Sequence, residues 1–343
     1  MRLLEVSDLT VSFPTADGMV RAVRGVSFGV DAGKTLGIVG ESGSGKSVAA
    51  MTLLGLSRGG TVSGSALFGG DDLLSMDEPD LRAVRGDRIA MVFQDPLSSL
   101  HPLYKVGWQI AEAIRAHTST SRRAAHERAI ELLGLVGIPQ PRRRVDDYPH
   151  QFSGGMRQRV MIAMALALNP ELVVADEPTT ALDATVQAQI LDLLLRLQNE
   201  LGMALIIITH DLGVIAQMAD EVLVMYAGRA VETADRRTAY YRAHHPYTLG
   251  LLASVPSAVG SGRLHPIPGT PPSPIQLPSG CPFRPRCAFE MDRCAVEEPA
   301  LMPVAGGDGH RSACWLPPGI IGDDEATRVE RRLASDLGRQ VAA

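Results

Sequence analysis

The eight residues GESGSGKS, at 40–47, constrain the fold more than any other part of this chain. They follow the short apolar run TLGIVG (35–40), which we expect to be a buried strand, and a helix-like segment runs from Lys46 to about Leu56. The eight residues fit the pattern G-x-x-x-x-G-K-[ST], and a strand before it and a helix after it are the context that this pattern requires. A glycine-rich turn with a chance lysine does not explain those flanks. The sequence therefore predicts an α/β unit with a phosphate-binding loop.

The chemistry of this phosphate loop (residues 40–47) follows from its residue types. Glycines let the backbone curl so that successive N–H groups point at phosphate oxygens, and the start of the helix adds partial positive charge. The lysine adds a full charge near the β- and γ-phosphates, and the serine after it offers a hydroxyl to Mg²⁺. We therefore expect a nucleoside triphosphate and Mg²⁺ as ligands, with contacts from Gly40, Ser42, Gly43, Gly45, Lys46 and Ser47.

Polar residues follow three further short apolar runs. LVVADEP (172–178) puts Asp176 at the end of a buried strand, where it can hold Mg²⁺, and Glu177 beside it as general base for an attacking water. His210 ends the run ALIIIT and can donate to the γ-phosphate, with a structural histidine as the alternative. Gln94, after MVF, can bridge Mg²⁺ and water, or it is an ordinary polar residue of a turn. Together these positions predict one site at the edge of a sheet.

Apolar strands that alternate with helical segments predict a parallel sheet covered on both faces. At 343 residues and 45% hydrophobic content, the chain can hold one large domain and a smaller unit. Residues 3–13 alternate as a strand, whereas 95–160 carry apolar residues at helical spacing and predict a mostly helical insert. Six prolines in 265–278 predict an extended connector, and the charged stretch 323–340 predicts a surface helix or a frayed tail.

Charge and hydropathy exclude several classes of protein. The formal net charge of −5 gives no overall attraction to nucleic acid or to anionic lipid. No apolar run approaches the roughly 20 residues of a membrane helix, and acidic residues come too early at the N-terminus for a signal peptide. We therefore expect a cytoplasmic protein without a nucleic-acid partner. In that reducing compartment, four clustered cysteines are more often metal ligands than disulfides.

The stretch QFSGGMRQRVMIAMALA (151–167) resembles the signature of ABC ATPases. The order of motifs along residues 1–233 is also similar to that family, from the phosphate loop to the glutamine, the signature, the acidic strand end and the histidine. Phe152 stands where the family usually has leucine, and Met156 where it usually has glutamine. The resemblance implies a P-loop NTPase fold of ABC type, with a RecA-like core, an antiparallel β subdomain and a helical subdomain over 95–160.

In that family two cassettes pack head to tail, and each ATP lies between the phosphate loop of one and the signature of the other. The resemblance therefore implies that Ser153, Gly154 and Gly155, at a predicted helix start, contact ATP held by a partner, together with Asp183. Phe13, at the end of the first strand, is the candidate to stack on adenine, with core packing as the alternative. The expected partner is a paralogous second ATPase rather than a second copy.

Three longer segments narrow the resemblance to the ATPase subunits of dipeptide, oligopeptide and nickel importers: FQDPLSSLHPLYKVGWQI, ADEPTTALDATVQAQILDLL and HHPYTLGLLASVP. It implies ATP hydrolysis at the cytoplasmic face of the membrane, two permease subunits, an extracytoplasmic solute-binding protein, and a C-terminal extension over 234–343. The solute, a peptide or nickel or another small molecule, does not touch such a subunit. The alternative is a soluble ABC ATPase acting on nucleic acid or ribosomes, which commonly has a second cassette or a long coiled-coil insert that this sequence lacks.

All cysteines of the chain come after residue 280: Cys281, Cys287, Cys294 and Cys314. In peptide-importer ATPases the similar segment carries a [4Fe–4S] cluster, so the resemblance implies one here, in a small irregular cysteine-rich domain over 281–314. The residues alone leave zinc open, with His310 replacing one cysteine, and leave unligated thiols open. Since this cysteine segment has few apolar residues, a metal would supply its folding energy, as a structural staple or as a redox or iron sensor. We expect a module separate from the phosphate site.

Overall fold

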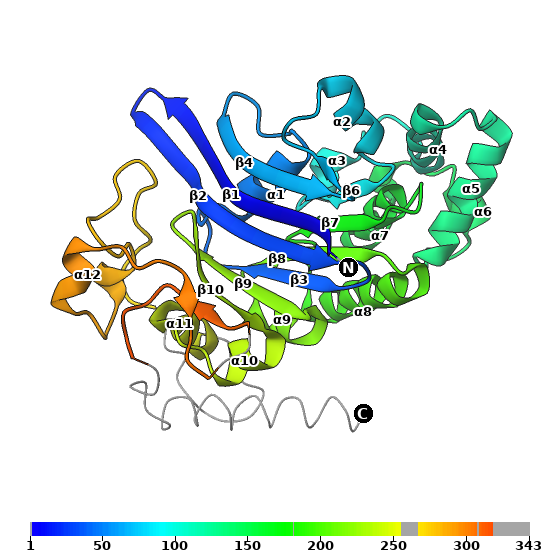
Figure 1. Ribbon diagram of the computed structural model, residues 1–343. Coiled ribbons are helices and arrows are strands. Elements are labelled where there is room, and N and C mark those ends of the chain that lie inside the picture. Colours follow the sequence, from blue (N-terminus) through cyan, green and yellow to red (C-terminus); the bar gives the residue numbers. More distant parts are fainter. Residues whose placement is uncertain (1, 181, 255–266, 307–308, 318–343) are drawn as a thin grey trace.

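The computed structural model describes residues 2–180, 182–254, 267–306 and 309–317. Its main sheet has eight strands in the order β11-β12-β10-β9-β3-β8-β7-β6 (Figure 1). The strands from β9 to β6 pair in parallel, and β10, β12 and β11 continue the sheet antiparallel. The parallel part comprises β3 (Thr35–Val39), β6 (Ile89–Val92), β7 (Leu172–Asp176), β8 (Ala204–Thr209) and β9 (Glu221–Tyr226).

Both faces of the parallel strands are covered, as their continuous apolar runs predict. In β8, Ile206 and Ile208 belong to a buried cluster that includes residues of α1 (Lys46–Leu53) and of the second sheet. Leu205 and Ile207 belong to a different buried cluster, formed with the helices on the opposite face. The parallel strands are therefore buried in their middle, and their polar residues lie at the strand ends.

A second, antiparallel sheet has the order β2-β1-β4-β5. Its strands are β1 (Arg2–Thr15), β2 (Gly18–Asp31), β4 (Thr61–Phe68) and β5 (Asp71–Asp72). The strand predicted at 3–13 lies within β1, which is longer because it pairs with β2 from one end to the other. Buried residues of this sheet and of α1 belong to one cluster, so both elements cover the same face of the main sheet.

Helices form the remaining layers. Residues 95–160 contain α3 (Pro96–Ser99), α4 (Val106–His117), α5 (Arg122–Leu135), α6 (Pro141–Arg144), η1 (Pro149–Gln151) and the first part of α7 (Gly154–Ala165). The other helices before the cysteine segment are α2 (Glu78–Val84), α8 (Ala184–Leu201), α9 (Leu212–Met218), α10 (Arg236–Tyr241) and α11 (Pro246–Ala253). In Figure 1, α4, α5 and α6 lie together at one end of the molecule. None of the helices in the described ranges is both long and apolar enough to span a bilayer.

The chain from residue 267 onward has little regular structure. It contains η2 (Arg284–Arg286), α12 (Asp292–Val296), β11 (Met302–Pro303) and β12 (Arg311–Ser312), and the proline-rich part from 267 to 278 has no helix or strand. β12 pairs with β10 (Arg229–Asp235), which attaches the segment to the main sheet. Figure 1 shows α12 at the end of the molecule opposite α4 to α6. The predicted helix or tail at 323–340 lies outside the described residues.

Candidate active site

The phosphate loop joins β3 to α1 and packs closely against a neighbouring strand. Gly43 and Gly45 have φ values of 79° and 97°, in the left-handed region that favours glycine. A Cβ atom at Gly45 would lie 2.2 Å from the carbonyl oxygen of Ala22 in β2, so only glycine fits there. The loop therefore holds the N-terminus of α1, with its free N–H groups, at one fixed place beside β2.

Lys46 is buried at the first position of α1. Its Nζ donates hydrogen bonds to the carbonyl oxygens of Gly40 (2.6 Å) and Glu41 (2.9 Å). Burial lowers the pKa of Lys46, and the carboxylates of Glu177, Asp176 and Glu41 oppose that shift. The loop itself therefore holds a largely desolvated ammonium group at the place where an anionic ligand would bind.

Asp176 meets the end of the phosphate loop. Its Oδ1 accepts a hydrogen bond from the Ser47 hydroxyl at 2.9 Å, which brings the end of β7 to the start of α1. Burial raises the pKa of Asp176, and the hydrogen bond from Ser47 works against that shift. A hydroxyl and a carboxylate oxygen are the hard ligands that Mg²⁺ prefers, so the chemistry of this pair suits that ion.

The Glu177 carboxylate is surrounded by polar side chains from adjacent strands. Gln94 Nε2 donates to its Oε2 at 3.0 Å, the Thr180 hydroxyl donates to the same atom at 2.8 Å, and His210 Nδ1 lies 3.3 Å from its Oε1. Gln94, Glu177 and His210 follow β6, β7 and β8, which are neighbours in the sheet. The backbone of Glu177 has a φ of 46°, a strained conformation of about 1–3 kcal/mol that is typical of functional sites.

The signature residues lie elsewhere on the surface. Ser153 precedes α7 and Asp183 precedes α8, and each side chain accepts a backbone N–H from the first turn of its helix. Ser153, Gly154 and Asp183 are exposed, and Gly155 is half-buried. Within the described part of the chain, no hydrogen bond or ion pair links these residues to residues 40–47. The structure therefore brings together the residues predicted around the phosphates and leaves the signature open to solvent.

Phe13 is half-buried in β1. Its ring packs against Gly60, where a Cβ atom would lie 2.8 Å away, and it borders the buried cluster beneath the antiparallel sheet. Across the hairpin it pairs with Val20, two residues before the Ala22 that contacts the phosphate loop. Its stacking on adenine stays a prediction.

Comparisons with known proteins identify the family. Residues 23–180 match the family model described as ABC transporter, and residues 231–294 match the oligopeptide/dipeptide transporter C-terminal region. The chain is 52% identical over 349 residues to the oligopeptide transport ATP-binding protein OppD of Bacillus subtilis, an alignment that covers 99% of this chain and 97% of the other. The chain belongs to the ATP-binding proteins of the ABC oligopeptide and dipeptide transporters.

Two further similarities agree with this family. The chain is 49% identical over 320 residues to the dipeptide transport ATP-binding protein DppD of Escherichia coli, covering 92% of this chain and 97% of that one. The solved structure of a dimeric ATP-binding cassette in a post-hydrolysis state, bound to ADP and Pi, superposes with a TM-score of 0.62 at 28% identity. It covers 68% of this chain and 99% of the solved one. The predicted P-loop NTPase fold of ABC type is confirmed.

The four cysteines of this ABC transport protein line one largely apolar pocket. All four are free, and the walls around them include Phe283, Phe289, Met291, Trp315 and Leu316. Burial raises the pKa of Cys281, raises that of Cys287 to about 11 and raises that of Cys314 to about 12. Unless a cation displaces their protons, these three thiols are therefore protonated at neutral pH.

The structure gives no geometric evidence for a metal in this pocket. Across the described ranges, which include every cysteine, no group of three or more His, Cys, Asp or Glu side chains is placed to hold a metal ion. His310, the predicted replacement ligand for zinc, does not line the pocket; its Nε2 lies 2.7 Å from Glu232 Oε1. The donor set suits a cluster or zinc, but the prediction of a [4Fe–4S] cluster gains no support from this geometry.

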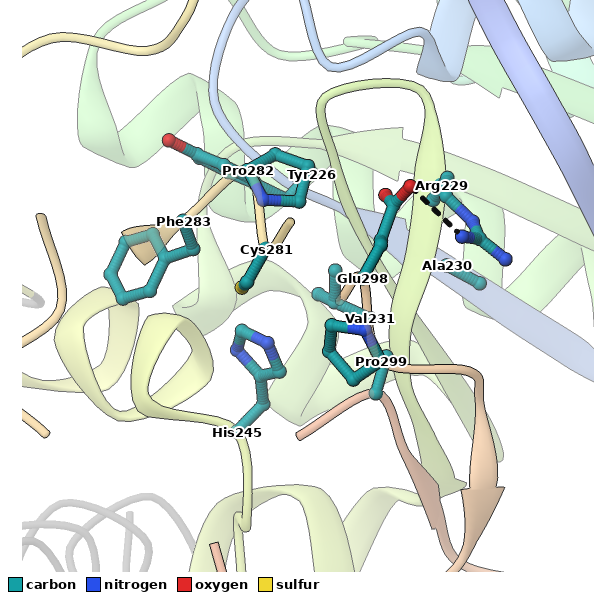
Figure 2. A pocket seen from close by; sticks show the side chains of 11 residues that line it. Tyr226, Arg229, Ala230, Val231, His245, Cys281, Pro282, Phe283, Glu298 and Pro299 are labelled. Carbon is teal, nitrogen blue, oxygen red and sulfur yellow. Dashed lines mark ion pairs between the residues drawn. The ribbon is translucent and has the colours of Figure 1, made fainter. Parts of the chain in front are cut away.

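A second pocket adjoins the first and shares one cysteine with it (Figure 2). Figure 2 shows Cys281 above the ring of His245, between Phe283 and Glu298. On the Glu298 side, Arg229 of β10 pairs with that carboxylate at 3.3 Å. The cysteine segment therefore packs directly on the last strands of the nucleotide-binding fold.

The structure also joins the cysteine segment to the phosphate loop, contrary to the expectation of separate modules. Arg286 Nη1 and Nη2 donate to the two carboxylate oxygens of Glu41 at 2.6 Å and 2.9 Å. The hydroxyl of Tyr247 in α11 accepts the backbone N–H of Glu41 at 2.7 Å. Sequence reasoning missed these three residues, because partners some 200 positions apart leave no local pattern. One signal was present: a glutamate inside a loop built for anions requires a cationic partner nearby.

Proposed function

We propose that this chain is the ATP-hydrolysing subunit of a transporter that takes up oligopeptides or dipeptides. The observation that carries the proposal is the cluster of Gln94, His210 and Thr180 around the Glu177 carboxylate, beside the Ser47–Asp176 pair. An acceptor for the proton of water and a site for Mg²⁺ lie next to a loop suited to phosphates, as phosphoryl transfer to water requires. The 52% identity with a protein of oligopeptide transport supports the solute class.

In this proposal each side chain has one task. Glu177 accepts a proton from water while the water oxygen bonds to the γ-phosphorus and the bond to the β–γ bridging oxygen breaks, which releases ADP and phosphate. Lys46 and the loop N–H groups stabilise the phosphate charge, and His210 donates to the γ-phosphate. Mg²⁺, when bound, neutralises phosphate charge, and the side chains that would hold it are those of Ser47, Gln94 and Asp176.

The active form in this proposal contains two cassettes. Ser153, Gly154, Gly155 and Asp183 would contact the ATP of a partner, which agrees with their exposure and their place at helix N-termini. The related cassette solved with ADP and Pi is dimeric, which supports the same arrangement here. The partner would be a paralogous ATPase, and Phe13 would stack on adenine.

The remaining partners are membrane proteins and a receptor. We assign residues 1–233 to the ABC domain and 234–343 to the C-terminal extension, with 95–160 as the helical subdomain that receives two permease subunits. Its exposed apolar side chains support this docking: Leu97, Leu103, Tyr104 and Trp108. The subunit would then sit peripherally at the cytoplasmic face of the membrane, with a solute-binding protein outside. Nickel or another small solute is the alternative cargo.

The cysteine pocket would hold a resident metal group in this proposal, a [4Fe–4S] cluster or, as the alternative, zinc. Four thiols on one apolar pocket support a sulfur-ligated metal, which would fix a segment that has little regular structure. Iron, sulfide and zinc analysis of protein purified without oxygen separates the two. Stoichiometric zinc without iron would rule out the cluster, and neither metal would rule out both.

Reconstitution tests the proposed function. The chain is co-expressed with candidate permease subunits and a candidate partner ATPase, and the complex is placed in vesicles with a peptide-binding receptor. We expect uptake of labelled peptide that depends on ATP and that is lost with Lys46→Ala, whereas Glu200→Ala in α8, an exposed matched control, retains it. ATPase activity stimulated by DNA or ribosomes instead of peptide and receptor would favour a soluble ABC ATPase and overturn the transport proposal.

A further inference from the structure

Every polar group of Glu41 in the phosphate loop is engaged by a neighbour. Its N–H donates to the Tyr247 hydroxyl, its carbonyl oxygen accepts from Lys46, and its carboxylate accepts two hydrogen bonds from Arg286. Two of these three neighbours come from the C-terminal extension, beyond residue 233. This second residue of the loop is therefore held from a part of the chain that lies outside the ATPase core.

Arg286 is itself firmly fixed. Its side chain is only 3% exposed, its Nε donates to the carbonyl oxygen of Pro268, and its Nη1 lies 3.3 Å from the Tyr226 hydroxyl. The guanidinium also lies 5.9 Å from the ring centres of Tyr226 and Phe283. A planar fork held by these four contacts can present both nitrogens to one carboxylate with little freedom to turn away.

The charge of Glu41 would otherwise oppose the task of the loop. Its carboxylate lies in the segment that receives a triphosphate. The Lys46 ammonium group already interacts electrostatically with the carboxylates of Glu177, Asp176 and Glu41. An uncompensated negative charge at this place repels phosphate oxygens, whereas a bidentate arginine cancels it.

We propose that Arg286 is a positioning residue of the nucleotide site: it neutralises Glu41 and, with Tyr247, fixes the phosphate loop in its binding conformation. The C-terminal extension is in this view part of the ATP site rather than an appended module. The inference rests on the proposed function of residues 40–47. It predicts that a change far along the chain alters the affinity for MgATP.

The test measures MgATP binding by the full chain in a Glu177→Gln background, so that hydrolysis does not interfere. We expect Arg286→Ala to raise the Kd about tenfold or more, the size of a lost charge-assisted pair. Adding Glu41→Gln should restore the Kd to within about threefold, because it removes the unpaired charge. Arg286→Lys keeps the positive charge but cannot donate two parallel hydrogen bonds, so its Kd should lie between the wild-type value and that of Arg286→Ala. Arg293→Ala, which breaks the exposed Arg293–Glu297 pair within the same extension and leaves the contacts of Glu41 in place, serves as the matched control and should bind normally.

The outcomes are separable. Normal binding by Arg286→Ala, or a double variant that binds as weakly as Arg286→Ala, overturns the inference, because a packing role alone is not rescued by Glu41→Gln. Lys46→Ala tests the proposed site itself: if it binds MgATP normally, the function assigned to residues 40–47 fails first. If Arg286→Ala does not fold, Arg286→Lys carries the test, through its Kd and through faster hydrogen exchange at residues 40–47. Unchanged values for both overturn the inference.

Discussion

The phosphate site and the cysteine segment are built in opposite ways. The first is positioned by backbone: neighbouring parallel strands end together and deliver Gln94, Glu177 and His210 to one place. The second has few helices or strands and is held by side chains, chiefly Arg286 on Glu41 and His310 on Glu232. A site built on strands tolerates the loss of one side chain structurally, whereas a segment held by buried polar pairs depends on each of them.

The largest expected effect is a loss of catalytic rate at the phosphate site without a change in its structure. Glu177→Gln keeps the shape of the side chain and removes the proton acceptor, so kcat for ATP should fall about 10³-fold or more. The Kd for MgATP should stay within about threefold of the wild-type value. Steady-state hydrolysis and nucleotide titration check both values, and near-normal turnover would exclude Glu177 as the base.

The next largest expected effect is a loss of stability where the cysteine segment is held on β10. Glu232 is 1% exposed, and its carboxylate accepts the backbone N–H groups of His244 and His245 and lies 2.7 Å from His310 Nε2. Glu232→Ala leaves these buried groups unpaired, so we expect a loss of about 3–4 kcal/mol of unfolding free energy.

Urea unfolding measures this loss, and the exposed Arg293–Glu297 pair provides the comparison within the same segment. Glu297→Ala should leave the urea midpoint nearly unchanged. Equal midpoints for the two variants would contradict the idea that buried pairs hold the cysteine segment.

The smallest effect is a pH dependence at His245, which lies outside the cysteine segment and lines its pocket. Burial lowers the pKa of His245 to about 4, so between about pH 6.5 and 4 the unfolded chain binds a proton that the folded chain does not. Stability should therefore fall as the pH drops through this window, by roughly 3 kcal/mol at most from this residue.

His245→Asn isolates that contribution. His245 Nδ1 accepts the N–H of Tyr247 at the start of α11, and asparagine can accept the same N–H without titrating. Urea midpoints between pH 7.5 and 4.5 should therefore fall less steeply in the variant. An identical slope in both proteins would assign the acid sensitivity to other groups.

The contrast also explains what the sequence could predict. Lys46, Asp176 and His210 could be predicted because each begins, ends or follows an element whose period is visible in the sequence, and parallel strands bring such positions together. Glu41 and Arg286 were missed because no periodicity joins them across 245 positions. The four cysteines could be grouped from the sequence, and all of them line one pocket, but their spacing suits more than one metal and therefore does not identify one.

The pairing of β12 with β10 has a further consequence for solubility. Without β12 and β11, β10 would be the outermost strand on that side, and its free backbone groups would offer a template to other chains. The cysteine segment thus also protects the sheet against edge-to-edge pairing with other chains. Truncated variants that end before Met302 should consequently aggregate even where their ATP pocket is complete.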